Sequence, residues 1–202
     1  MLQAAPFTIG VVSDTHVPDR IDRLHPDLLP ALKQHNVQAI FHAGDISTPR
    51  VLDELGVIAP VTAVRGNRDW LLRGKLPTQQ SITIHRVQIA LLHGHINFTK
   101  YLKDKFYHLT IGYRLEHYLP RLIAACPAAR VIVFGHTHQP VTLEHQGCLL
   151  FNPGSCTTKS LKDPHPHFGI LTIHPDGRIQ TETLPLTGYR LGARHWIKME
   201  ES

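Results

Sequence analysis

Five short apolar runs along the chain each end in Asp, Asn or His, and this recurrence constrains the fold more than any other feature. Each run is rich in β-branched and aromatic residues, the composition of a buried strand. The runs and the residues after them are 7–12 before Asp14 and His16, 37–42 before Asp45, 60–64 before Asn67, 87–92 before His93, and 131–134 before His136 and His138. Because the carboxyl ends of strands that alternate with helices gather at one edge of a sheet, we expect these side chains in one crevice.

The chemistry of this set indicates divalent cations. It offers two carboxylates, one amide oxygen and four imidazoles, but no thiolate. Taken singly, each residue is more often a turn residue or a buried histidine than a ligand, and only the recurrence at strand ends favours the functional interpretation. Seven ligands exceed the need of one ion, so two ions sharing a carboxylate fit better than a structural zinc. His136 and His138 could each serve a different ion, or a loop could aim both at one.

The segments between these strands predict helices and hairpins. A short amphipathic helix is expected within 18–36; its start is undecided, because Pro26 suits a first turn whereas Pro30 would clash inside a continuous helix. A second helix is expected at 49–56, with Thr48 as its N-cap. Hairpins are expected at 81–92, 141–151 and 168–184.

Two regions are less constrained. Aromatic and leucine side chains at roughly helical spacing occupy 96–127, with breaks expected at Gly112 and Pro120. Core packing is the default explanation of this stripe, and a lid or an oligomer contact is the alternative. The tail at 187–202 has mixed charge and predicts no particular element. Since no repeat or linker divides the chain, we expect one domain over residues 1–202.

Composition limits the partners and the compartment. The net charge of +5 suits an anionic ligand, but no run of like charges indicates specific binding to nucleic acid. The three cysteines lack C-x-x-C spacing, which argues against disulfides and a thiolate zinc site. We find neither a signal-peptide pattern nor an apolar stretch of about 18 residues, so we expect a cytoplasmic protein with no membrane span.

The order D-x-H, G-D, G-N, H-G-H and G-H-T-H resembles that of the calcineurin-like metallophosphoesterases. The segments Gly66-Asn67-Arg68-Asp69 and Asn152-Pro153-Gly154-Ser155 are most similar to the small bacterial and archaeal phosphodiesterase branch, which is related to a retromer subunit. The resemblance implies an α/β fold (α+β in some schemes): a four-layer α-β-β-α sandwich of two mixed sheets. It covers a core of about 7–184, with a longer helical segment at 96–127 and a C-terminal extension at 185–202.

The resemblance also assigns roles to the residues at the strand ends. The seven ligands divide between two ions: Asp14, His16 and His138 for one, Asn67, His93 and His136 for the other, and Asp45 as the bridge. We expect Mn²⁺, with Ni²⁺, Zn²⁺, Fe²⁺ and Mg²⁺ as alternatives. Ions about 3.5–4 Å apart would activate a bridging hydroxide for attack on phosphorus.

One departure from the family leaves the proton donor open. Many larger members carry a histidine directly after the asparagine, thought to assist the leaving group, and this chain has Arg68 there. His95 is the candidate for a contact with the leaving group or phosphate, with a solvated or supporting histidine as the alternative. Asn67 and Arg68 are the candidate contacts with the substrate phosphate.

The implied function is a dinuclear metal-dependent phosphodiesterase acting on a small phosphodiester, for which a cyclic nucleotide is one option. A phosphomonoesterase or a nuclease with the same centre is the first alternative. A non-catalytic interaction scaffold, as in the retromer relative, is the second, and the complete set of ligand positions disfavours it. The segment 96–127 and the tail would reshape substrate access or drive homo-oligomerisation.

Overall fold

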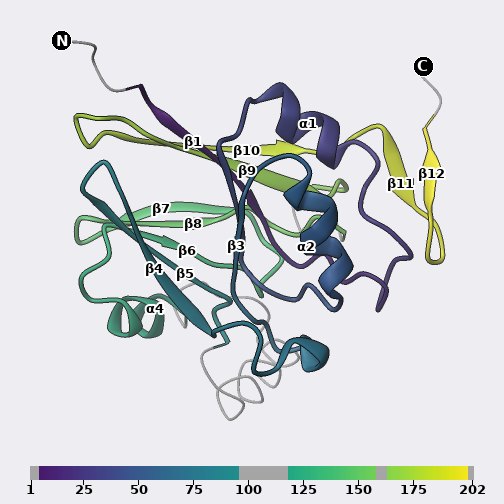
Figure 1. The fold of residues 1–202 in the computed structure, drawn as a ribbon, viewed down its shortest axis with the longest axis horizontal. Coiled ribbons are helices and arrows are strands. Elements are labelled where there is room, and N and C mark those ends of the chain that lie inside the picture. Colours follow the sequence, from purple (N-terminus) through teal and green to yellow (C-terminus); the bar gives the residue numbers. More distant parts are fainter. Residues whose placement is uncertain (1–4, 96–117, 158–162, 200–202) are drawn as a thin grey trace.

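Ten strands form two five-stranded sheets in the computed structural model, which describes residues 5–95, 118–157 and 163–199 (Figure 1). The first sheet has the order β10-β9-β1-β2-β3, and the second β4-β5-β6-β8-β7. The first contains β1 (Phe7–Val12), β2 (Ala39–His42), β3 (Val61–Ala63), β9 (His167–Ile173) and β10 (Ile179–Pro185). The second contains β4 (Gln79–Ile84), β5 (Val87–Leu92), β6 (Val131–Val133), β7 (Val141–His145) and β8 (Cys148–Asn152).

Both sheets are mixed. In the first, β1 pairs in parallel with β2 and β2 with β3, while β9 is antiparallel to β1 and to β10. In the second, β5, β6 and β8 are parallel, and the edge strands β4 and β7 are antiparallel to their neighbours. The parallel strands of each sheet therefore deliver the loops that follow them to a common edge, as the sequence predicted.

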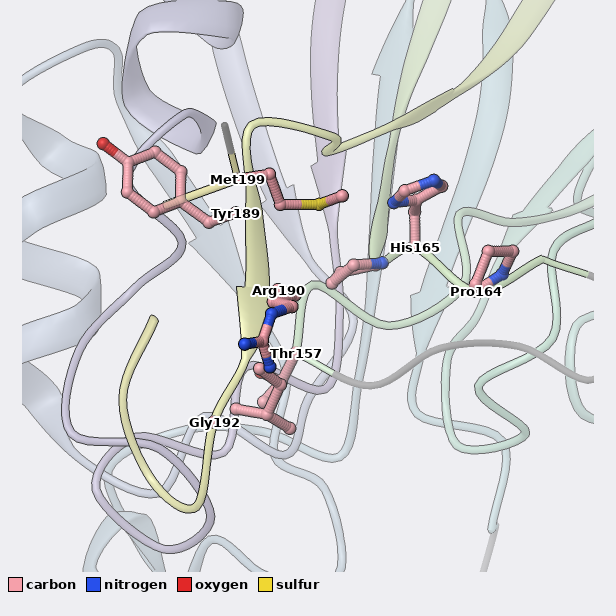
Figure 2. A pocket seen from close by; sticks show the side chains of 9 residues that line it. Thr157, Pro164, His165, Tyr189, Arg190, Gly192 and Met199 are labelled. Carbon is pink, nitrogen blue, oxygen red and sulfur yellow. The ribbon is translucent and has the colours of Figure 1, made fainter. Parts of the chain in front are cut away.

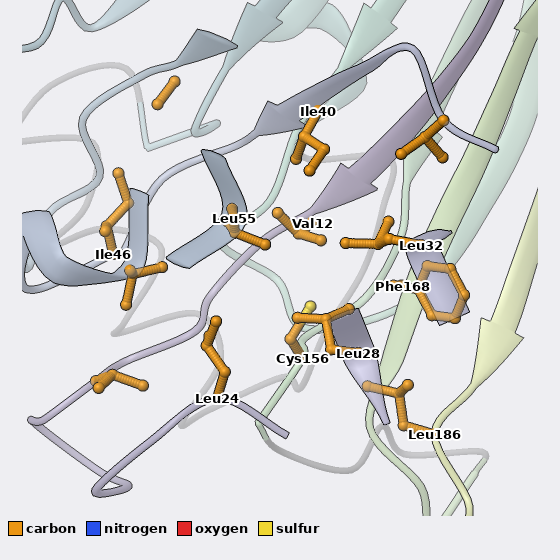
Figure 3. Close-up of a cluster of buried hydrophobic side chains, with 14 of the residues drawn as sticks. Val12, Leu24, Leu28, Leu32, Ile40, Ile46, Leu55, Cys156, Phe168 and Leu186 are labelled. Carbon is orange, nitrogen blue, oxygen red and sulfur yellow. The ribbon is translucent and has the colours of Figure 1, made fainter. Parts of the chain in front are cut away.

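Helices cover the outer face of each sheet. The helices α1 (Leu28–Gln34) and α2 (Pro49–Gly56) lie on the first sheet, and α4 (Leu119–Ala125) lies on the second (Figure 1). Figure 3 shows the cluster between the first pair and its sheet, where Leu28, Leu32 and Leu55 lie with Val12 and Ile40. The order helix, sheet, sheet, helix confirms the predicted four-layer α/β sandwich.

Successive side chains of these strands point to two opposite faces that are both buried, which explains why the strand sequences are continuously apolar. In β6, Val131 and Val133 enter the cluster between the two sheets, whereas Ile132 enters the cluster beneath α4. In β1, Val11 faces the opposite sheet and Val12 faces α1 and α2. A strand buried on both faces has no polar side, so its sequence shows no alternation.

Two prolines lie at helix starts. The helix α1 begins at Leu28, which places Pro30 in the first turn, where its missing N–H breaks no intrahelical bond. Pro120 is the second residue of α4, which begins at Leu119, so a helix boundary lies where the break was expected. Gly112 and most of the aromatic stripe lie outside the described residues.

The tail forms an element that its sequence did not predict. The strands β11 (Tyr189–Leu191) and β12 (Trp196–Lys198) pair as an antiparallel hairpin, seen beside α1 in Figure 1. Trp196 is 5% exposed and belongs to the cluster around α1 and α2. In the described part of the chain, no helix is long and apolar enough to cross a membrane.

Candidate metal centre

The loops after five strands bring the seven predicted ligands together. The loops follow β1, β2, β3, β5 and β6, three from one sheet and two from the other. Five of these side chains fall into two overlapping groups able to hold a metal ion, one of Asp14, His16 and His138, and one of Asp14, Asp45 and His93. These candidate ligand side chains therefore gather at the strand ends, as predicted.

The first group centres on Asp14 Oδ1. This oxygen lies 3.2 Å from His138 Nε2 and 3.9 Å from His16 Nε2. The two Nε2 atoms are 3.3 Å apart, within hydrogen-bond distance. Three ligand atoms thus converge on one point, as a cation would require.

The second group lies around His93. Its Nε2 is 3.4 Å from Asp45 Oδ1 and 4.0 Å from Asp14 Oδ1. The amide oxygen of Asn67 lies 3.1 Å from His93 Nε2 and 3.1 Å from His136 Nδ1. Asn67 and His136 therefore join this group, as the resemblance implied.

Both carboxylates lie between the two groups. Asp45 presents Oδ1 to His93 and Oδ2 to His16, the latter at 3.9 Å. Asp14 Oδ1 faces His138 on one side and His93 on the other. The resemblance implied only Asp45 as a bridge, so the shared position of Asp14 is an addition from the geometry.

Hydrogen bonds around Asp14 and His93 fit a divalent cation. Asp14 Oδ2 accepts from Ser13 Oγ at 2.6 Å and from His136 N at 3.0 Å. Its Oδ1 is buried and finds no hydrogen-bond donor among the described residues. A buried anionic oxygen without a donor is costly, and a metal ion would satisfy it. His93 Nδ1 donates to the carbonyl of Ala43 at 2.7 Å, which leaves Nε2 as a free ligand atom.

The electrostatics also match a ligand set. Burial alone would raise the pKa of Asp14, but the imidazoles of His138, His93 and His16 hold that pKa well below its usual range. Burial lowers the pKa of His16 to about 3 and that of His136 well below its usual value. A charged carboxylate and neutral imidazoles are the protonation states that bind metals.

Asp45 and His93 form a coupled buried pair. Burial raises the pKa of Asp45. Burial would lower the pKa of His93, but the carboxylates of Asp45 and Asp14 raise it above its usual value. A cation placed between them would reverse both shifts and release a proton.

Five of the seven predicted ligands have a left-handed backbone. Their φ values are 53° for Asp14, 50° for His16, 56° for Asp45, 71° for His136 and 56° for His138. Each such residue costs on the order of 1–3 kcal/mol, and strain of this kind concentrates at functional sites. The hydrogen bonds Asp14 N to Gly44 O and His16 N to Asp45 O, both 3.0 Å, hold two of these loops together.

Two glycines permit the loops to approach closely. A Cβ at Gly66 would overlap the backbone nitrogen and carboxylate of Asp45. A Cβ at Gly135 would overlap Ser13 Oγ and crowd the carboxylate of Asp14. The Gly before Asn67 and the Gly before His136 are thus required by contact with the two shared carboxylates.

Asp69 has a role that the sequence did not reveal. It is 1% exposed, and its Oδ1 accepts from the backbone N–H groups of Ile46 and Ser47 at 2.7 and 2.6 Å. Its Oδ2 accepts from Gly66 N at 2.7 Å. Asp69 therefore ties the loop that carries Asp45 to the loop that carries Asn67. Only its place in the Gly-Asn-Arg-Asp segment could have indicated it.

The turn at 152–155 supports the ligand loops from behind. Asn152 Nδ2 donates to Gly135 O at 2.9 Å, and Ser155 Oγ donates to Asp14 O at 3.0 Å. Both side chains are fully buried. The turn thus fixes the backbone beside His136 and at Asp14.

The remaining candidates, Arg68 and His95, lie beside the ligands. Arg68 N donates to Asp45 Oδ1 at 2.8 Å, and its guanidinium pairs through Nη1 with the carboxylate of Asp19. The ring of His95 is centred 5.4 Å from that of His93 and 6.1 Å from that of His136. Burial, then the charges of His93 and Arg65, lower the pKa of His95 to about 4.

Comparisons with known proteins agree with this architecture. The model of the calcineurin-like phosphoesterase superfamily domain matches residues 7–176. A probable metallophosphoesterase of Methanothermobacter thermautotrophicus is 33% identical over 169 residues, which are 84% of this chain and 86% of that protein. Vps29 of Entamoeba histolytica complexed with Zn²⁺ has a TM-score of 0.64 at 23% identity, covering 90% of this chain and 100% of that one. A structure described as a novel archaeal phosphodiesterase has a TM-score of 0.57 at 22% identity, covering 88% and 100%. At these identities the two solved structures show the fold alone.

Proposed function

Because the chain belongs to the calcineurin-like phosphoesterase superfamily, we propose that it is a dinuclear metal-dependent phosphodiesterase acting on a small phosphodiester. The observation that carries this proposal is the position of Asp14 and Asp45 between two groups of ligand atoms. A carboxylate shared by two ligand groups suits a pair of ions, and in this structure two carboxylates are shared in this way.

Each ion would have its own set of side chains. The first would be held by Asp14, His16 and His138. The second would be held by Asn67, His93 and His136, and Asp45 would be shared between the two. Divalent ions at these places supply Lewis acidity, which lowers the pKa of a water and offsets charge on the phosphoryl oxygens. We propose Mn²⁺ as the native metal, and metal analysis of the purified protein tests this directly.

The chain itself would bind and orient the phosphate. The N–H donors of the Arg68 guanidinium suit phosphoryl oxygens, and its backbone is held at Asp45. Low pKa makes His95 neutral at pH 7, so it would accept or relay a proton rather than supply one as an imidazolium. The superfamily and the likeness to an archaeal phosphodiesterase support a phosphodiester, for which a cyclic nucleotide is one candidate.

Hydrolysis of bis(p-nitrophenyl) phosphate in the presence of Mn²⁺ tests the proposal. We expect turnover by the wild type, and a loss of at least about 100-fold in kcat/KM for Asp45→Asn, because the carboxylate that presents Oδ1 to His93 and Oδ2 to His16 becomes a neutral amide. Asp53→Asn is the matched control, since Asp53 is exposed on α2 and is not one of the candidate ligands. Equal turnover by the wild type and Asp45→Asn, or none by either with metal bound, would refute the proposal.

A panel of monoester, diester and oligonucleotide substrates separates the phosphodiesterase from a phosphomonoesterase or a nuclease.

Exposed apolar side chains favour a second candidate, a protein-interaction role. Trp70 and Leu71 are 61% and 71% exposed on the short 3₁₀ helix η1 (Trp70–Leu72), just after the loop of Asn67. The fold is shared with Vps29. A partner bound stoichiometrically by a protein without hydrolytic activity, with binding lost in Trp70→Ala and retained in Asp45→Ala, would favour this role.

A further inference from the structure

The C-terminal hairpin contacts the loop that leads away from the candidate metal centre. The hairpin comprises residues 188–199, and the loop comprises residues 17–27, which directly follow His16. The superfamily match ends at residue 176, so the hairpin lies beyond the part of the chain that the family model describes. Its function has to be inferred from its contacts.

Four hydrogen bonds join the hairpin to the loop, and three of them involve Arg194 and Trp196. Asp22 N donates to the carbonyl of Arg194 at 3.0 Å. The guanidinium of Arg194 donates through Nη2 to the carbonyl of Pro18. The indole Nε1 of Trp196 donates to the carbonyl of Arg23 at 3.0 Å. These bonds occupy backbone groups of a loop that has no regular ladder of its own.

Buried aromatic packing reinforces the attachment. Trp196 and His25 are 5% and 2% exposed, and their rings meet edge-on with centroids 4.4 Å apart. At the far end of the loop, Gly188 N donates to Asp27 Oδ2 at 3.0 Å. The hairpin therefore fixes the loop from Pro18 to Asp27.

The loop in turn holds a side chain at the rim of the centre. Asp19, one residue beyond Pro18, pairs with Nη1 of Arg68. Arg68 follows Asn67, and its N–H donates to Asp45 Oδ1. The guanidinium is near enough to His16 to lower the pKa of that histidine. Nε and Nη2 of Arg68 have no partner among the described residues, so they are free to donate to a phosphate oxygen.

We propose that Arg194 and Trp196 are positioning residues, which hold loop 17–27 so that Asp19 presents the Arg68 guanidinium to the substrate phosphate. This inference rests on the proposed phosphoesterase function. An exposed ion pair such as Asp19–Arg68 is weak by itself, because two long side chains must be ordered in water. Fixing the loop by the hairpin removes part of that cost before the substrate arrives.

The test compares Arg194→Ala and Trp196→Phe with the wild type, using bis(p-nitrophenyl) phosphate and Mn²⁺. Trp196→Phe keeps a ring against His25 and removes the indole N–H. We expect both variants to raise KM by about threefold to tenfold with kcat changed by less than about twofold, because a displaced guanidinium weakens binding and leaves the ligands in place. Arg190→Ala is the control, since Arg190 belongs to the same hairpin but lines a cavity of about 760 Å³ with Thr157 and His165 (Figure 2).

The route through Asp19 has its own test. Asp19→Asn should raise KM to a similar degree, and adding Arg194→Ala to Asp19→Asn should raise it no further, because both changes release the same guanidinium. A fall in KM for Asp19→Asn would show that Asp19 shields Arg68 from the phosphate, and additive effects would show that the hairpin acts elsewhere. Either result overturns the proposal.

Two measurements decide the proposal even if the wild type hydrolyses nothing. Hydrogen exchange of the 17–27 amides should be faster in Arg194→Ala and unchanged in Arg190→Ala. Calorimetric titration of the Mn²⁺-loaded proteins with inorganic phosphate should show weaker binding in Arg194→Ala. Unchanged exchange, or unchanged phosphate affinity, would refute the positioning role. Absence of hydrolysis with weakened phosphate binding would refute only the proposed enzymatic function.

Discussion

At the scale of single residues, His42 shows how a buried imidazole beside the centre is kept neutral. Its Nδ1 accepts from Gly44 N at 3.2 Å, and its Nε2 lies 3.1 Å from Thr15 Oγ1. Since Nδ1 accepts, the proton resides on Nε2 and the ring is uncharged. Burial, despite the opposing effect of the Asp69 and Asp14 carboxylates, lowers the pKa of His42 from 6.5 to about 4.

His42 should make the metal-free protein sensitive to acid. Between about pH 4 and 6.5 the unfolded chain binds a proton at this residue and the folded chain does not, so stability rises with pH across this window and is lost as pH falls. Urea unfolding in the presence of EDTA gives the free energy of unfolding at each pH. The increase of this free energy with pH should be smaller in His42→Gln, by up to about 1.4 kcal/mol per pH unit. His145→Gln, at an exposed histidine on β7, is the control. If the free energy of unfolding of His42→Gln changed with pH as it does in the wild type, His42 would not be the source of the acid sensitivity.

The candidate ligands were predictable because Asp, Asn and His recur after apolar runs, and the structure places these side chains together. Their backbone conformation was not predictable. Asp14, His16 and Asp45 lie at φ values of 50–56° because hydrogen bonds and glycine contacts from other loops fix them there. Those contacts are between residues far apart in the chain, and local sequence carries no signal for them.

At the scale of elements, we expect Asp69 to affect metal affinity as strongly as a ligand does, although it would not contact the metal itself. Asp69→Asn replaces an acceptor of three backbone N–H groups with an amide that accepts at one atom only. We expect the affinity for Mn²⁺ to fall about 10- to 100-fold, as for other residues that orient metal ligands. Isothermal titration calorimetry measures this loss, and Asp53→Asn should bind as the wild type does. Wild-type affinity in Asp69→Asn would show that the two loops hold their positions without the carboxylate.

The positions of the strands in the two five-stranded sheets were predicted to within about two residues, because buried strands have a distinct composition. Helix starts were less certain, since they depend on which proline occupies the first turn. In α1 this is Pro30, three residues into the helix, and in α4 it is Pro120. Proline marks a helix end or a helix start equally well from sequence, and tertiary packing decides between them.

At the scale of the whole molecule, the sandwich gives the centre its rigidity because the ligands come from both sheets. The layer order followed from the family resemblance and not from the residue pattern, and the strand order was not predicted. Neither the family resemblance nor the residue pattern predicted the C-terminal hairpin. Its Trp196 is buried against His25 and the core around α1, which are distant in sequence. A mixed-charge tail has no periodicity from which such docking could be inferred.

Two ions bound between two sheets should stabilise the fold in two separable steps. In the wild type we expect about two Mn²⁺ per chain and an unfolding midpoint that rises with Mn²⁺, by about 2.7 kcal/mol of stability per site at a concentration 100 times its dissociation constant. His138→Ala removes a side chain 3.2 Å from Asp14 Oδ1, and His136→Ala removes one that contacts Asn67. Each variant should therefore lose one site and keep most of the other. Metal analysis should then find about one ion per chain, and calorimetry a smaller rise of the unfolding temperature with Mn²⁺.

Loss of both ions in both variants would mean that the two groups of ligands hold a single cooperative site. Retention of both ions would remove His136 and His138 from the ligand set.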